Sequence, residues 1–150
     1  MSDSTNFQIF NRVALFALME LFDNFPKQIE LDANTLALNA FPEKDKTSVE
    51  EAWDLMSFGV ETLSWLESEG FVSVKQRTLG GHFIGVRLTL KGLTLLGYEL
   101  PNGKSSIAEQ AREVFSGAGK QTATEVLKSA FQYVLFSATT AVMEKGGAPL

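Results

Sequence analysis

The stretch from residue 47 to residue 92 limits the fold more than any other part of this chain, because its hydrophobic period changes twice without a long loop. Four elements are predicted in it, in this order: a helix over 47–69, a strand over 71–78, a strand over 82–90 and a short helix over 90–97. Gly70 is placed to end the first helix, and Leu79-Gly80-Gly81-His82 supplies the glycines of a tight turn between the strands. This pattern predicts a mainly α fold with a small β hairpin.

The chain before residue 47 predicts two more helices. A helix over 7–25 is expected to be largely buried, and Phe25-Pro26 ends it. Its apolar face consists of Phe10, Val13, Ala14, Phe16, Ala17, Leu18 and Leu21. Residues 28–31 allow a short strand, and Asp32 is a suitable N-cap for a helix over 33–40.

The helix predicted over 47–69 carries apolar residues on two of its sides. A stripe at helical spacing predicts the core face: Val49, Ala52, Trp53, Met56, Val60 and Leu63. Phe58 and Trp65 lie off that stripe, beside Glu61. Large apolar side chains on a polar face indicate a covered surface. We expect the C-terminal helices of the same chain to cover them; the alternative is that Phe58, Trp65 and Glu61 form a partner-binding patch.

The last third of the chain has a different character. Pro101-Asn102-Gly103 predicts a boundary between a domain at 1–103 and a C-terminal helical extension at 104–150. The capping-box pairs Ser106 with Glu109 and Thr122 with Glu125 predict a pair of helices, over 106–117 and 122–143. The second helix is apolar nearly all round beyond Ser129, so either the chain's own core or a second subunit is expected to cover it.

Composition narrows the environment of the protein. Cysteine is absent, which fits a reducing compartment, and the polar start MSDSTNFQ does not resemble a secretory signal. The longest uncharged span, between Lys128 and Glu144, is shorter than the ~20 apolar residues that cross a bilayer. We therefore expect a soluble, cytoplasmic protein with no membrane partner. The net charge of −5 argues against broad, non-specific binding of nucleic acid.

Seven residues around the predicted hairpin match a recurring pattern: Leu66, Gly70, Phe71, Leu88, Thr89, Lys91 and Gly92. In this spacing residues 66–92 resemble the end of the winged helix in bacterial regulators of the multiple-antibiotic-resistance and phenolic-acid types. There is also a faint similarity to short uncharacterised prokaryotic winged-helix proteins. With the upstream helices the resemblance covers residues 7–97 and implies a winged helix-turn-helix, here followed by a C-terminal helical pair. It implies no single function, because winged helices serve as DNA readers, protein docks and scaffolds.

Charge is distributed unevenly over this unit. Residues 47–70 carry six acidic and no basic side chains, whereas residues 71–104 carry five basic side chains against Glu99 alone. The third helix of a winged helix normally enters the major groove, where carboxylates oppose the DNA phosphates. The layout therefore argues against standard groove insertion. The basic hairpin is either a solvated edge, a surface that docks on the acidic helix of a second copy, or a nucleic-acid contact. The candidate nucleic-acid contacts are Lys75, Arg77 and Arg87.

No pattern in the chain predicts catalysis. The segment SGAGKQT at 116–122 lacks the first glycine and the hydroxyl residue of a phosphate-binding loop. His82 is the only histidine, and a metal site wants several ligands. We therefore predict no enzyme, no cofactor and no metal site. Two functions stay open: a non-catalytic protein-binding module that forms a homodimer, which the charge layout favours, and a DNA-binding transcription regulator whose hairpin contacts phosphates.

Overall fold

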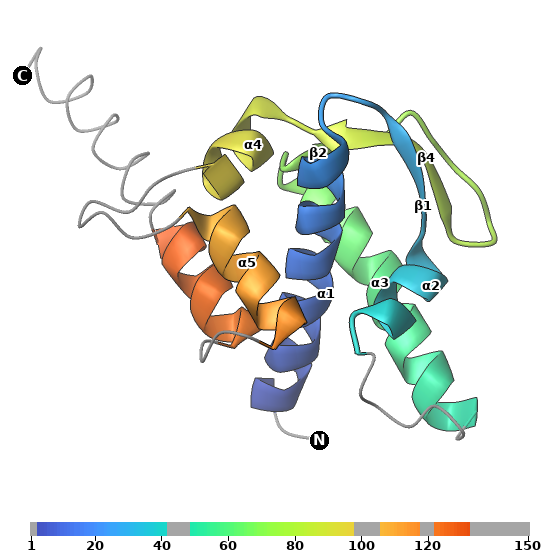
Figure 1. Cartoon of the computed structure of the whole chain (residues 1–150). Coiled ribbons are helices and arrows are strands. Elements are labelled where there is room, and N and C mark those ends of the chain that lie inside the picture. Colours follow the sequence, from blue (N-terminus) through green and yellow to red (C-terminus); the bar gives the residue numbers. More distant parts are fainter. Residues whose placement is uncertain (1–2, 42–48, 98–105, 118–121, 133–150) are drawn as a thin grey trace, which may run out of the picture.

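The computed structural model describes residues 3–41, 49–97, 106–117 and 122–132 (Figure 1). Its labelled elements are α1 (Asp3–Asn24), β1 (Ile29–Asp32), α2 (Ala33–Asn39), α3 (Val49–Ser68), β2 (Val72–Ser73), β3 (Gln76–Arg77), β4 (His82–Leu88), α4 (Leu90–Gly97) and α5 (Ile107–Ser116). Residues 123–132 are also helical. The predicted fold class is confirmed: the chain is mainly α, with one small antiparallel sheet. Within the described ranges, no helix has both the length and the apolar character needed to span a bilayer.

The small sheet has β4 at its centre. β1 pairs antiparallel with one edge of β4, and β2 and β3 pair antiparallel with the other edge. The strand predicted over 71–78 is therefore two short strands in one register, with Ser73 opposite Arg87 and Gln76 opposite Ile84. Gly85, at φ +67°, lies opposite the break, and a Cβ there would be 2.8 Å from the Lys75 side chain. On its other edge, β4 has one extra residue relative to β1 between Phe83 and Val86, so the left-handed glycine lies at a bulge in the β1–β4 ladder.

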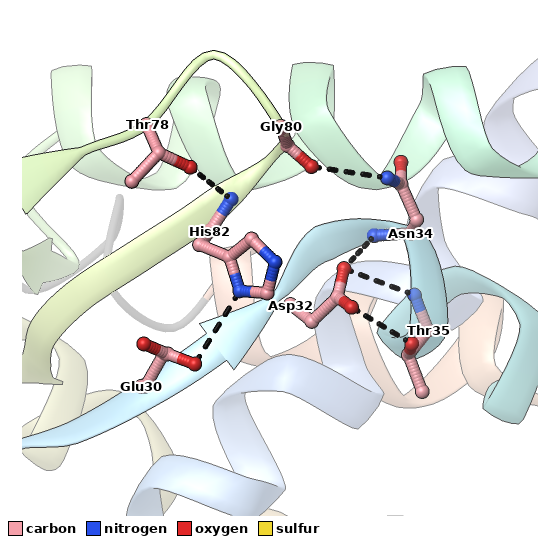
Figure 2. A network of polar contacts seen from close by, with 7 residues as sticks. All are labelled: Glu30, Asp32, Asn34, Thr35, Thr78, Gly80 and His82. Carbon is pink, nitrogen blue, oxygen red and sulfur yellow. Dashed lines mark hydrogen bonds and ion pairs between the residues drawn. The ribbon is translucent and has the colours of Figure 1, made fainter.

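A network of polar contacts ties the hairpin turn to the start of α2 (Figure 2). Asp32 caps α2 as predicted, because its carboxylate accepts from the backbone N–H groups of Asn34 and Thr35. The Asn34 side chain in turn donates to the Gly80 carbonyl at 3.3 Å, and the Ala33 N–H donates to the Gly81 carbonyl at 2.9 Å. The turn is thereby held against the N-terminus of α2.

The buried face of α3 differs from the predicted stripe. Val49 and Trp53 are 69% and 65% exposed, and of the six predicted residues only Leu63 is fully buried. The face that is buried consists of Leu55, Gly59, Thr62, Leu63 and Leu66. A Cβ at Gly59 would lie 2.1 Å from the Ala33 carbonyl oxygen, so α2 packs directly on the backbone of α3. This close approach turns α3 by about a quarter of a turn from the orientation that its largest side chains indicate.

The residues that carry the sequence resemblance meet where α3, the hairpin and α4 join. The Thr89 hydroxyl donates to the Gly70 carbonyl. It also accepts from the Gly92 N–H and so caps the N-terminus of α4. Lys91 Nζ donates to the Glu69 carbonyl at 2.7 Å and lies 4.4 Å from the centroid of the Phe71 ring. A Cβ at Gly92 would lie 2.2 Å from the Phe71 carbonyl oxygen. These residues therefore hold the hairpin between two helices.

The C-terminal helices share a hydrophobic core with α1 and α4. Buried residues of this part are Ile107, Ala108, Ala111, Ala123, Val126, Leu127 and Ala130. Both predicted capping boxes mark helix starts: the Ser106 hydroxyl accepts from the Glu109 N–H, and the Thr122 hydroxyl accepts from the Glu125 N–H. α5 ends at Gly117 as predicted, at φ +76°. The proposed boundary at Gly103, the start of the helix predicted over 47–69 and the helix beyond residue 132 lie outside the described residues.

Candidate functional site

A groove runs between α1 and α3 on the side of α3 that carries Phe58 and Trp65. It consists of two adjoining hollows of about 420 and 600 Å³, which share Phe10, Phe58 and Trp65 as lining residues. Asn6 and Phe7 complete the first hollow. Phe7 is 65% exposed, so it stands at the edge of the groove, whereas Phe10 and Phe58 are half-buried and form its floor.

Trp65 is held in place by other aromatic rings. Its ring meets that of Phe10 edge to face, with centroids 5.2 Å apart, and stacks on that of Phe71 at 6.1 Å. Phe131 of the C-terminal helix meets Trp65 at 6.0 Å from a third direction. Trp65 still remains 37% exposed. Edge-to-face and offset aromatic pairs favour fixed ring orientations, so three neighbours restrict the orientation of the Trp65 ring.

The groove becomes polar toward the hairpin. Its second hollow is also lined by Glu61, Ser64, Ser68 and Arg77. Arg77 Nη1 donates to the Ser64 hydroxyl at 3.1 Å, and Arg77 Nη2 forms an ion pair with Glu67. Thr62 Oγ1, also on this side, is buried and has no hydrogen-bond partner among the described residues. The groove therefore offers an apolar end at Phe7 and a charged end at Arg77.

The predicted partner patch lies around this groove. Phe58 and Trp65 line both hollows, and Glu61 lines the second. The predicted intrachain cover is present in part, because Phe131 packs on one side of Trp65. Phe7 was missed by the sequence reasoning. The signal was there: Phe7 precedes Phe10 by three residues and so continues the apolar face of α1 by one turn.

The three candidate nucleic-acid contacts do not form one patch. Arg77 is directly opposite the buried Phe83, lies 5.1 Å from the centroid of its ring and turns toward α3. Arg87 is exposed between the buried Val86 and Leu88, so it projects from the opposite face of the sheet. Lys75 is exposed beside Gly85. The hairpin therefore divides its cations between two faces.

The acidic residues of α3 divide in a similar way. Glu50, Asp54 and Glu61 are exposed, whereas Glu67 is paired with Arg77. α3 carries neither lysine nor arginine. Of the exposed acids, Glu61 lines the groove, and Asp54 lies one turn before Phe58 on α3.

The remaining polar constellation gives no catalytic arrangement. His82 Nδ1 lies 3.3 Å from Glu30 Oε2, and both side chains are exposed (Figure 2). In the described part of the chain, no three histidine, aspartate or glutamate side chains are grouped so that they could hold a metal ion.

Comparisons of the chain with protein-family models, with curated proteins and with solved structures find no match.

Proposed function

We propose that this chain is a non-catalytic protein-binding module that acts as a homodimer, and that the groove between α1 and α3 is its docking surface. The observation that carries the proposal is the aromatic lining of the groove, with Phe7 and Trp65 partly open to solvent. Exposed apolar clusters of this kind are typical of protein interfaces, in which aromatic side chains dominate the binding energy.

The polar end of the groove supports a protein ligand over DNA. Glu61 lines it and is exposed, and Arg77, the cation that lines it, is paired with Glu67. A phosphate backbone approaching this side of α3 would meet carboxylates that repel it. A protein surface with apolar side chains and a few hydrogen-bond donors meets no such obstacle.

Phe7→Asp tests the proposal, with Leu79→Asp as its matched control. Both replaced side chains are large, apolar and exposed, but Leu79 lies at the hairpin turn, away from the groove. Static light scattering over a concentration series should give a dimer for the wild type and for Leu79→Asp. Phe7→Asp should give the monomer mass, because a carboxylate would enter the apolar contact.

Thermal unfolding of the two variants provides the check on folding. Both substitutions are at exposed positions, where the stability change is usually within about 0.5 kcal/mol. A Phe7→Asp protein with the same mass as the wild type would reject the groove as the docking surface.

DNA binding is the second candidate, and one observation favours it. Lys75 and Arg87 are exposed on a hairpin that directly follows a helix, as in the DNA-binding proteins that the sequence resembles. The test is binding to mixed duplex DNA over a range of salt concentrations. Affinity that falls steeply with salt, and is lost in the Lys75→Glu/Arg87→Glu variant, would favour this function. Absence of binding at low salt would reject it.

A further inference from the structure

We infer that the groove is filled by residues 133–143 of a second copy of this chain, in a reciprocal exchange between two protomers. The inference rests on the proposed function and adds the identity of the segment that docks. It draws on the groove itself, on the point at which the described chain stops, and on the direction in which it is then running.

Residues 133–143 have the composition of a segment that requires an apolar surface. They contain no charged residue, and eight of the eleven are apolar. Leu135, Ala138 and Val142 recur at helical spacing, so a helix would place them on one face. The groove offers a matching surface of aromatic side chains.

The segment begins next to the groove. The described chain stops at Gln132, one residue after Phe131. Phe131 contacts both Trp65 and Phe71, with ring centroids 6.0 and 5.6 Å apart. The last described residues before the apolar segment therefore lie against an aromatic side chain of the groove.

The direction of the C-terminal helix favours exchange over a fold-back within one chain. Thr124 accepts a hydrogen bond from Asn11 of α1, and Phe131, two turns later, reaches Phe71 beyond the end of α3. The chain thus runs away from the Phe7 end of the groove; in Figure 1 the helix over 123–132 rises in the same sense as α1.

Entering its own groove would require the chain to reverse direction. Residues 133–145 contain neither glycine nor proline, the residues that most readily form turns. A second copy related by a two-fold axis perpendicular to this helix arrives from the opposite direction, so its segment enters without a reversal.

The dimensions agree with this arrangement. Eleven residues of α-helix span about 16 Å, at about 1.5 Å per residue. Phe58 and Ser68, the first and last residues of α3 that line the groove, are ten residues apart and thus about 15 Å apart along the helix axis. The segment is long enough to cover the groove from end to end.

Disulfide trapping in the full-length chain tests the inference, because the native sequence contains no cysteine. Asn6→Cys is placed in one chain and Ala138→Cys in a second chain with a different affinity tag. Asn6 lines the groove and is exposed, so this change leaves the aromatic lining intact. The two chains are mixed, allowed to exchange and oxidised. We expect a disulfide-linked heterodimer that carries both tags.

Controls separate the alternatives. In the first control, the cysteine of the first chain is placed at Leu79, which is exposed and lies away from the groove. Leu79→Cys should give no linked product with Ala138→Cys. A chain that carries both Asn6→Cys and Ala138→Cys should form interchain links. If that chain instead closes only on itself, the segment folds back within one chain and the exchange is rejected.

The mass measurement on Phe7→Asp distinguishes failure of this inference from failure of the proposed function. A monomeric Phe7→Asp together with no Asn6–Ala138 link in the wild-type background would retain the groove as a docking surface and reject residues 133–143 as its ligand. A Phe7→Asp protein that remains dimeric would reject both.

Discussion

Arg77 on β3 forms an ion pair with Glu67 on α3, and thereby joins the basic hairpin to the acidic helix within one chain. The guanidinium also donates to Ser64 and lies over the ring of Phe83. The charge contrast that the sequence shows between helix and hairpin is therefore partly compensated inside the fold. The charged side chains that stay exposed on α3 without a basic neighbour on the same helix are acidic, and Glu61 among them lines the aromatic groove.

The Arg77–Glu67 pair should contribute little to stability. The two side chains are 47% and 29% exposed, and solvent-exposed ion pairs are worth about 0–1 kcal/mol. A double-mutant cycle with Arg77→Ala and Glu67→Ala, read by urea unfolding, should give a coupling free energy in that range that decreases as salt is added. A coupling of several kcal/mol that salt does not change would contradict the prediction.

The orientation of α3 can be tested with Trp53 and Leu63. Leu63 is fully buried, so Leu63→Ala should lower the free energy of unfolding by about 2–5 kcal/mol. Trp53→Ala removes a larger side chain but should cost less than about 0.5 kcal/mol, because Trp53 is 65% exposed. Chemical denaturation of both variants measures the two changes in the free energy of unfolding. A larger loss for Trp53→Ala than for Leu63→Ala would support the core face predicted from the sequence.

Two glycines of α4 provide a matched pair. A Cβ at Gly92 would lie 2.2 Å from the Phe71 carbonyl oxygen, whereas a Cβ at Gly97 would meet no atom of the described residues within 4 Å. Gly92→Ala should therefore destabilise the protein by about 1–3 kcal/mol, as overpacking does. Gly97→Ala should leave the melting temperature unchanged or raise it, because alanine reduces the entropy of the unfolded chain. Equal effects of the two changes in thermal unfolding would argue against the contact between α4 and Phe71.

The protein should be more stable with valine than with threonine at position 62. Its hydroxyl is buried without a hydrogen-bond partner in the described part of the chain, and such a group costs about 1–3 kcal/mol. Valine has nearly the same shape, so Thr62→Val should raise the free energy of unfolding. Thr94→Val, on the exposed side of α4, is the control and should change it by less than about 0.5 kcal/mol. A destabilised Thr62→Val protein would indicate that the hydroxyl has a partner.

Local signals located most of the elements correctly. The Asp32, Ser106 and Thr122 caps and the terminating Gly70 and Gly117 each act through backbone groups a few residues away, so the sequence alone contains the information. The apolar face of α1 was predicted for the same reason, because helical spacing along one element suffices to define it.

The candidate site was only partly predictable. Phe58, Trp65 and Glu61 were identified as one patch because they occupy one side of one helix. The groove itself requires Phe7 and Phe10 from α1, more than forty positions earlier in the chain, and no local pattern reports that proximity.

The amino-acid sequence by itself determined several helix caps, the turns and the mainly α character with a small sheet, because caps, turns and hydrophobic period are local properties. The tertiary structure alone decided which side of α3 is buried, which cation pairs with which acid, and that α1 and α3 enclose an aromatic groove. These features depend on contacts between segments that are distant in the sequence. Gly59 lets α2 approach α3 at Ala33 because it has no side chain, and Arg77 reaches Glu67 because its side chain is long.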